Sequence, residues 1–186
     1  MWRRTLAREA VHLFLVIAWV AILHRTVGAF EVEGASMEPT LHSDEYVVVD
    51  TLLPASRAVQ RGEVIVFRFP RNPRVEYVKR VIGLPGEIIA VAHGRVWVNG
   101  QALYEPYIRD VPRYLWGPAR VPPDSLFVLG DNRNRSSDSH LWGPVPIANV
   151  VGRAVIAWRP LADWTWLGGQ GPGMEAVVRG PVAGSK

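Results

Sequence analysis

Apolar and polar residues alternate through the middle of the chain, and this alternation predicts β-strands. From residue 30 to residue 158 the period is mostly two, and Val, Ile and Phe are frequent, as in half-buried strands. Turn signals separate the segments: Pro85-Gly86 favours a type II turn, and Asn99-Gly100 favours a tight hairpin. We expect strands over residues 45–49, 62–69, 75–83, 88–92, 95–98, 125–129 and 149–158.

Two regions depart from this pattern. Residues 101–124 are irregular and rich in proline and aromatic residues, and we interpret them as a small excursion from the main domain. Residues 161–186 form a tail rich in glycine and proline, whose tryptophans either contact lipid or cover a sheet edge. The predicted fold is therefore mainly β: an antiparallel sheet domain over residues 30–160 with a small β extension.

An apolar run precedes this domain. Residues 10–23 are apolar except for His12, and three arginines stand before them. The run is shorter than the roughly 20 residues that span a bilayer. A neutral His24 and a snorkelling Arg25 would let residues 27–30 complete the outer boundary. We therefore favour a single transmembrane helix within residues 1–29.

Two other interpretations of this run stay open. A cleaved signal peptide would have its small-residue cleavage site at residues 27–29, although Arg25 is an awkward charge so close to that site. A buried core helix should show a polar face, and this run shows almost none. Under the first two interpretations the positive charges stay in the cytoplasm, and the chain beyond Phe30 lies outside the plasma membrane.

Composition narrows the class of protein. Hydrophobic residues make up 48% of the 186 residues, which excludes a disordered chain. The absence of cysteine excludes disulfides, thiolate metal sites and cysteine nucleophiles. The formal net charge of +4 suits an anionic membrane or nucleic acid, but no nucleic-acid-binding motif is present. Eight tryptophans favour the membrane instead.

The first candidate for chemistry is Ser36, within the sequence GASMEPTL at residues 34–41. Small neighbours allow close approach of a substrate, and Pro39 fixes its own backbone angle, so the turn is rigid. A lone serine in such a turn more often satisfies a local amide. A catalytic serine also needs a base to take its proton.

Lys79 is the first candidate base. It lies within a strand and shares a face with Tyr77 and Val81, so burial on that face would require a neutral or paired amine. Lowering the lysine pKa from ~10.4 to ~7–8 corresponds to ~4 kcal/mol of desolvation, which an apolar strand face can supply. The alternative base is His140, with Asp138 or Asp131 as the third member of a triad.

A polar loop at residues 130–140 directly follows an apolar strand. Its carboxylates and guanidinium groups can satisfy one another, as in a buried structural network. Ser136 and Ser139 are candidates for a hydroxyl that orients the Lys79 amine.

These three stretches together resemble the type I signal peptidases, which are membrane-anchored serine proteases of bacterial export. The sequence SMEPT at residues 36–40 is similar to the nucleophile motif, and YVKRVIGLPGE at residues 77–87 to the general-base motif. GDNR at residues 130–133, followed by Ser136, Asp138 and Ser139, is similar to the third motif. The resemblance runs in order over most of residues 10–158.

The resemblance implies a role for each matching position. Ser36 would be the nucleophile, Lys79 the general base, and Ser136 would hydrogen-bond the Lys79 amine. Asp138 would form an ion network with Arg133 and Arg80. The Ser36 backbone N–H would contribute to the oxyanion hole. Gly34 occupies the position at which some members add a hydroxyl, so the second donor would be a backbone N–H or a water molecule.

The resemblance also implies the substrate. Small pockets would select Ala-x-Ala-like cleavage sites in the signal peptides of preproteins, and they would be lined by Phe30, Val32, Met37, Leu41, Tyr77 and Val78. No metal or cofactor is implied, nucleic acid is not expected as a partner, and membrane lipid is. We expect a monomer in the plasma membrane, with the N-terminus cytoplasmic and the catalytic domain outside.

The predicted function is endopeptidase cleavage of signal peptides by a Ser–Lys dyad through an acyl-enzyme. One alternative is a Ser–Lys protease dedicated to a single secreted or conjugation substrate. Another is a non-catalytic, membrane-tethered β module that binds extended peptides by edge pairing. A self-cleaving repressor would carry a DNA-binding domain, and the sequence shows none.

Overall fold

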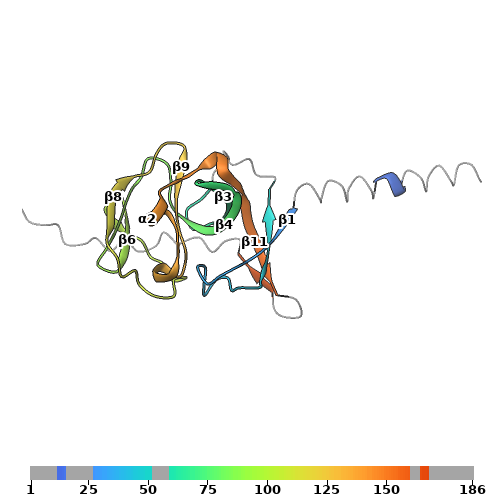
Figure 1. The fold of residues 1–186 in the computed structure, drawn as a ribbon, viewed down its shortest axis with the longest axis horizontal. Coiled ribbons are helices and arrows are strands. Elements are labelled where there is room, and N and C mark those ends of the chain that lie inside the picture. Colours follow the sequence, from blue (N-terminus) through green and yellow to red (C-terminus); the bar gives the residue numbers. More distant parts are fainter. Residues whose placement is uncertain (1–11, 16–26, 52–58, 160–163, 168–186) are drawn as a thin grey trace, which may run out of the picture.

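Two antiparallel sheets make up the part of the chain that the computed structural model describes, residues 12–15, 27–51, 59–159 and 164–167. The larger sheet has the strand order β1-β2-β11-β3-β4-β9-β10, and β12 pairs with β11 (Figure 1). Its strands are β1 (Val27–Glu31), β2 (Tyr46–Asp50), β3 (Val64–Phe69), β4 (Asn72–Gly83), β9 (Ser125–Leu129), β10 (Val145–Pro146), β11 (Val150–Trp158) and β12 (Trp164–Trp166).

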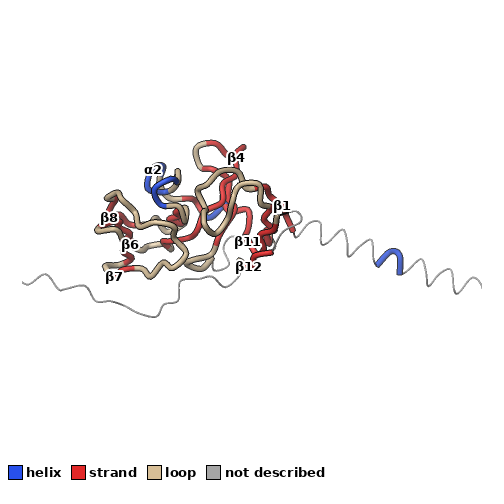
Figure 2. The backbone as a smooth tube through the Cα atoms, turned by 90° about the horizontal axis from the view of Figure 1, so that it is seen from below, coloured by secondary structure: helices blue, strands red, loops and turns tan. Residues whose placement is uncertain are grey.

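The smaller sheet has the order β7-β6-β5-β8. Its strands are β5 (Ile88–Ala92), β6 (Arg95–Val98), β7 (Gln101–Ala102) and β8 (Trp116–Arg120). Figures 1 and 2 both place β6 and β8 at the end of the molecule opposite β1 and β11. The only helices in the described residues with assigned bounds are the short η1 (Arg133–Arg135), α2 (Ser139–Trp142) and η2 (Ile147–Asn149).

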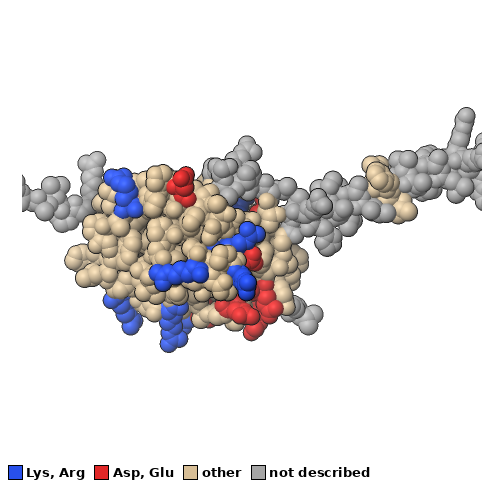
Figure 3. Space-filling model, turned by 45° about the horizontal axis from the view of Figure 1, so that its top comes forward, with Lys and Arg blue, Asp and Glu red and all other residues tan. Residues whose placement is uncertain are grey.

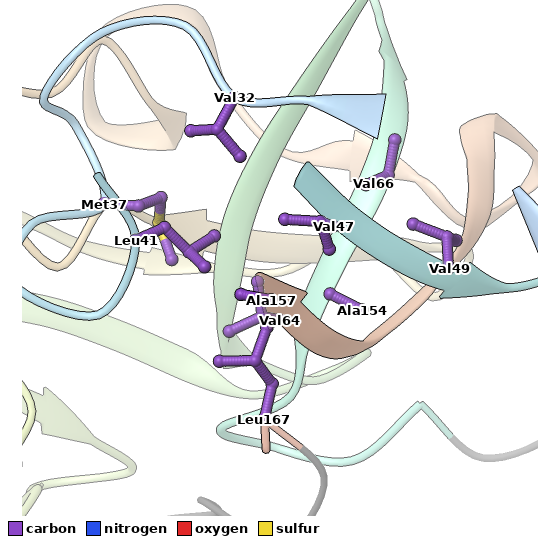
Figure 4. Packing of buried hydrophobic residues seen from close by; sticks show 10 residues of the cluster. All are labelled: Val32, Met37, Leu41, Val47, Val49, Val64, Val66, Ala154, Ala157 and Leu167. Carbon is purple, nitrogen blue, oxygen red and sulfur yellow. The ribbon is translucent and has the colours of Figure 1, made fainter. Parts of the chain in front are cut away.

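Alternating burial along the strands forms the core. In β2, Val47 and Val49 are buried while their neighbours are half-buried, as the period of two requires. They belong to a cluster inside the curled end of the larger sheet, which also contains Val32, Met37, Leu41, Val64, Val66, Ala154, Ala157 and Leu167 (Figure 4). A second cluster lies between the two sheets, around Ile82, Ile89, Val96, Phe127 and Leu129.

The predicted fold class, a mainly β domain of antiparallel sheets with a small extension, is confirmed. The predicted strands all occur, with ends within a few residues of those expected. Asn99 and Gly100 have φ angles of 51° and 80° and join β6 to β7, as a tight hairpin requires. At the Pro85-Gly86 turn, Gly86 has a φ of 81°, and the Glu87 N–H donates to the Leu84 carbonyl.

Three boundaries differ from the sequence-based ones. β1 begins at Val27, inside the segment expected to finish the membrane anchor, because Val27–Glu31 pairs along its whole length with β2. β4 begins at Asn72, before the strand expected over residues 75–83. The excursion at residues 101–124 contributes β7 and β8 to the smaller sheet. The sequence did not predict β8 because this strand contains Gly117-Pro118, and proline is uncommon in strands.

The expected anchor falls almost entirely outside the described residues. Of residues 10–23, only residues 12–15 are described, and they are helical. No helix within the described ranges is both long enough and apolar enough to cross a membrane. Of the tail, residues 164–167 are described: β12 pairs with β11 and Leu167 is buried, while Trp164 and Trp166 remain exposed.

Candidate active site

Ser36 and Lys79 meet at the centre of the site. Ser36 lies in the loop between β1 and β2, and Lys79 lies in β4. The Lys79 Nζ donates to the Ser36 Oγ over 2.8 Å and to the Val78 carbonyl over 2.9 Å. The structure thus brings together the two residues that the sequence singled out as nucleophile and base, which are 43 positions apart.

The environment of Lys79 favours the neutral amine. Its side chain is buried, with 4% of the residue's surface exposed. Burial lowers the lysine pKa from 10.5 to about 8, although the negative charges of Asp138 and Asp131 act in the opposite direction. A hydroxyl within hydrogen-bond distance of an amine that loses its proton near pH 8 has the geometry needed for general-base chemistry.

The turn that carries Ser36, residues 34–41, is called the serine turn below. The loop after β9 holds it in place. The Asn132 backbone N–H donates to the Ser36 carbonyl over 3.1 Å, and the Asn132 side-chain amide donates to the Ala35 carbonyl over 3.0 Å. Gly130 packs so closely that a β-carbon there would overlap the Ser36 carbonyl oxygen and the Ser136 hydroxyl. The position of Ser36 therefore depends on a segment almost a hundred residues away.

A buried ion pair joins the same loop to β4. Arg80 and Asp131 are fully buried, and two hydrogen bonds of 2.8 and 2.6 Å connect them. The Thr40 hydroxyl, at the end of the serine turn, donates to Asp131 over 2.5 Å, and Arg80 also donates to the Gly62 carbonyl. Because each charge has several partners, the pair can be buried without a large uncompensated cost.

The excursion supplies a second buried pair. Glu105 accepts two hydrogen bonds of 2.7 Å from Arg133, whose Nε donates to the Gly130 carbonyl. Burial opposes the charged form of Arg133, but the hydrogen bonds and charge of Glu105 outweigh it and raise the pKa of this arginine. The Tyr107 ring stacks on Arg80 at 4.0 Å, and its hydroxyl donates to Glu105.

The expected network of Asp138 with Arg133 and Arg80 is not formed. Arg80 pairs with Asp131 and Arg133 pairs with Glu105. Asp138 instead caps α2, accepts a hydrogen bond from the Gly130 N–H, and lies 2.5 Å from the His140 Nδ1. The resemblance implied that these charges would pair, but the direction of each side chain decided the partners.

Ser136 also differs from the role that the resemblance implied, and the Gly34 N–H is not available as the second oxyanion donor. The Ser136 hydroxyl is buried and has no hydrogen-bond partner in the described part of the chain, so it does not bond Lys79 in this structure. The Gly34 N–H donates to the Ser43 hydroxyl over 3.3 Å and is therefore not a free oxyanion donor. The other candidate hydroxyl, Ser139, donates nothing to Lys79; it accepts a hydrogen bond from the Val128 N–H.

His140, the alternative base, lies elsewhere in the network. Its ring stacks on Tyr114, with 4.2 Å between the ring centroids, and its Nδ1 lies against Asp138. The hydrogen-bond partner of the Ser36 hydroxyl is Lys79. The geometry therefore favours the amine over the imidazole.

A cleft of about 400 Å³ opens beside the Ser36–Lys79 pair. Its walls include Phe30 and Val32 on one side and Tyr77 and Val78 on the other, and these four were expected there. Val47 and Val66 also line it. The two remaining residues of the expected pockets, Met37 and Leu41, do not line the cleft; they are 1% and 0% exposed and pack in the core cluster. In Figure 4 they lie together beneath Val32.

Two strand edges border the cleft. β1 is the first strand of the larger sheet, and β2 is its only partner among the strands that the structure describes. β4 pairs with β9 only from Arg80 onward, so residues 72–79 have β3 on one side and, among the described strands, no partner on the other. Free backbone groups along such edges can pair with an extended peptide.

Comparison with known proteins identifies the family. A family model described as "Signal peptidase, peptidase S26" matches residues 4–159. The chain belongs to this family. Signal peptidase I of Leptolyngbya laminosa is 46% identical over 137 residues, which is 70% of this chain and 68% of the relative.

Other members of the signal peptidase family match over more of their length. Signal peptidase I of Bacillus caldolyticus is 37% identical over 82% of this chain and 91% of the relative. The crystal structure of a signal peptidase I from Enterococcus faecalis has 34% sequence identity, covers 52% of this chain and 97% of that one, and superposes with a TM-score of 0.44.

Several residues of this family member's site were missed by sequence reasoning. Asn132 and Thr40 stand inside motifs that the sequence singled out, but their hydrogen bonds to the serine turn and to Asp131 depend on the fold. Glu105 and Tyr107 lie in the excursion, and nothing in their local sequence indicates a buried role. No described group of three or more His, Asp or Glu residues is arranged to hold a metal.

Proposed function

We propose that this chain is a serine endopeptidase that removes signal peptides from exported preproteins, with Ser36 as nucleophile and Lys79 as general base. The observation that carries the proposal is the 2.8 Å contact between the Ser36 Oγ and the buried Lys79 Nζ. Family membership supports the substrate, since the curated relatives are signal peptidases I of bacteria and a thylakoidal processing peptidase of Arabidopsis thaliana.

The first half of the reaction forms an ester. The neutral Lys79 amine takes the proton of the Ser36 hydroxyl while the Oγ attacks the scissile carbonyl carbon. The resulting oxyanion accepts a hydrogen bond from the Ser36 backbone N–H and from a second donor. Lys79 then gives its proton to the leaving amine, the C–N bond breaks, and the signal peptide is left as an acyl group on Ser36.

The second half releases the acyl group. Lys79, neutral again, takes a proton from a water molecule that attacks the ester carbonyl carbon. Collapse of the second tetrahedral intermediate breaks the bond to the Ser36 Oγ, which regains its proton from Lys79. The signal peptide leaves as a carboxylic acid, which loses its proton to solvent, and no cofactor enters either half.

The cleft suits an extended peptide with small side chains. The peptide would lie between the free edges of β1 and β4, with its backbone paired to at least one of them. Alternate side chains would point toward the apolar lining around Val47 and Val66. Because Phe30, Val32 and Tyr77 crowd this lining, small residues on both sides of one variable residue fit the Ala-x-Ala pattern.

The N-terminal run fits a membrane tether. We propose that residues 1–29 contain one transmembrane helix built around the apolar run at residues 10–23, with a cytoplasmic N-terminus. The catalytic domain would then face outward, as a monomer. β1 begins four residues after this run, which would keep Ser36 near the membrane surface. Confining enzyme and preprotein to one layer raises their effective concentration.

The test is a preprotein cleavage assay with the full chain in detergent. We expect Ser36→Ala and Lys79→Arg to abolish cleavage, the second because a guanidinium cannot act as a base although its charge is kept. Thr51→Ser, a conservative change outside the cleft, is the control for expression and purification, and it should cleave as the unaltered chain does. Cleavage that survives Ser36→Ala would exclude Ser36 as the nucleophile, and cleavage that survives Lys79→Arg would favour His140. Absence of cleavage by the unaltered chain would leave the peptide-binding module as the better interpretation.

A further inference from the structure

The cleft beside Ser36 carries negative charge on its exposed walls. Glu31 and Glu33 line it on the β1 side, and Glu76 lines it on the β4 side. All three are exposed. No hydrogen bond or ion pair joins their carboxylates to another side chain in the described part of the chain. The one cationic residue of the lining, Lys79, is buried and already bonded to Ser36 and Val78.

This charge does not follow from the composition of the chain, which is basic with a formal net charge of +4. In the view of Figure 3, Lys and Arg are spread over the surface, whereas most Asp and Glu gather toward one side. Glu76 stands opposite Arg68 in the β3–β4 ladder, which partly offsets its charge. Glu31 stands opposite Tyr46, so no cation faces it from the neighbouring strand.

The cleft has an apolar floor, which includes Val47 and Val66, and a charged mouth, which includes Glu31 and Glu33. Val47 and Val66 are buried at 1% and 3% exposure, whereas Glu31 and Glu33 are exposed to solvent. In an extended peptide successive side chains point to opposite sides. If two small residues point at the floor, the residue between them points at the mouth, where the carboxylates lie.

We propose that Glu31 and Glu33 are specificity-determining residues that favour substrates with Lys or Arg between the two small residues of the cleavage site. The inference rests on the peptidase function proposed above and adds the charge of the substrate to it. A cationic side chain at that position would lie near unpaired carboxylates, whereas an acidic one would be repelled. Each exposed pair contributes modestly, so we expect a total preference of about fivefold at low salt.

The experiment compares three peptides that differ only at this residue, which is Lys, Gln or Glu. The value of kcat/KM would be measured with the full chain in uncharged detergent, at about 20 mM and about 500 mM NaCl. We expect kcat/KM for the Lys peptide to exceed that for the Glu peptide about fivefold at low salt, and this ratio to shrink at high salt because exposed charges are screened.

Two variants assign the preference to these residues. In Glu31→Gln/Glu33→Gln the Lys-to-Glu ratio should fall to within a factor of about two. In the matched control Asp110→Asn/Asp124→Asn, which removes two exposed carboxylates outside the cleft, the ratio should stay at the wild-type value. The ratio is the readout, so a change in overall rate does not affect the conclusion.

The possible failures are distinguishable. Equal kcat/KM for all three peptides, with cleavage still dependent on Ser36, would overturn this inference and leave the proposed function intact. A preference that persists in Glu31→Gln/Glu33→Gln would also overturn it, since the charge would then come from elsewhere. Absence of cleavage of all three peptides and of a preprotein would overturn both proposals together.

Discussion

Lys79 shows how burial changes the chemistry of a single residue. An exposed lysine is protonated at neutral pH and cannot act as a base. In β4 the Lys79 side chain is withdrawn from water, its pKa is lowered to about 8, and its Nζ is directed at the Ser36 hydroxyl. The position of Lys79 in the strand thus both withdraws the amine from water and directs it at the Ser36 hydroxyl.

This pKa leads to a prediction of pH dependence. Lys79 must be neutral to accept a proton, and it is neutral above its pKa, so kcat/KM should rise with pH and reach half its limiting value near pH 8. The measurement is a kcat/KM profile from about pH 6 to about pH 10, with a substrate that lacks ionisable groups in that range. A rise centred near pH 6.5 would instead indicate a histidine base and would contradict the assignment.

Among the structural elements, the loop after β9 is the one on which the geometry of the active site depends. It carries Gly130, Asp131 and Asn132, and each contacts either the serine turn or β4. Glycine is required at its first position because the Ser36 carbonyl and the Ser136 side chain occupy the space of a β-carbon. The loop therefore sets the distance between nucleophile and base.

Gly130→Ala tests this dependence. The added methyl group must displace the Ser36 backbone or Ser136, so we expect kcat to fall at least about tenfold and stability to fall by about 1–3 kcal/mol. The measurements are preprotein cleavage and urea unfolding. Arg135→Ala, an exposed change on the same loop, should alter neither; a Gly130→Ala enzyme with wild-type activity would show that the close packing is not needed.

Across the whole molecule, the excursion ties the smaller sheet to the active site. Its Glu105 pairs with the buried Arg133, and its exposed Arg109 pairs with Glu38 in the serine turn. The two ion pairs differ in burial: Arg133 and Glu105 are 0% and 4% exposed, whereas Arg109 is 52% exposed. The first pair should therefore matter far more to stability than the second.

Glu105→Gln and Glu38→Gln compare these pairs directly. Glu105→Gln leaves the Arg133 charge buried without its carboxylate, so we expect a loss of about 3–5 kcal/mol in the free energy of unfolding. Glu38→Gln breaks a solvent-exposed pair and should cost at most about 1 kcal/mol. Urea unfolding of both variants gives the comparison, and equal losses would mean that burial does not control the strength of these pairs.

Local patterns in the sequence were sufficient to predict the strands and to single out Ser36 and Lys79. Alternation of apolar and polar residues predicted the strands, and the turn signals at Asn99-Gly100 and Pro85-Gly86 marked two connections, because strand period and turn conformation are local properties. The pairing of Ser36 with Lys79 was expected from their types and motifs, and the structure places them 2.8 Å apart.

Tertiary structure alone decided which charges pair and which residues face the cleft. The resemblance grouped Asp138 with Arg133 and Arg80, but the arginines have other partners: Glu105 from the excursion pairs with Arg133, and Asp131 from the loop after β9 pairs with Arg80. Met37 and Leu41 match pocket positions by sequence yet pack in the core. The physical reason is that a strand pattern gives the face on which a side chain lies, whereas the neighbour across that face depends on how distant strands are ordered and curled.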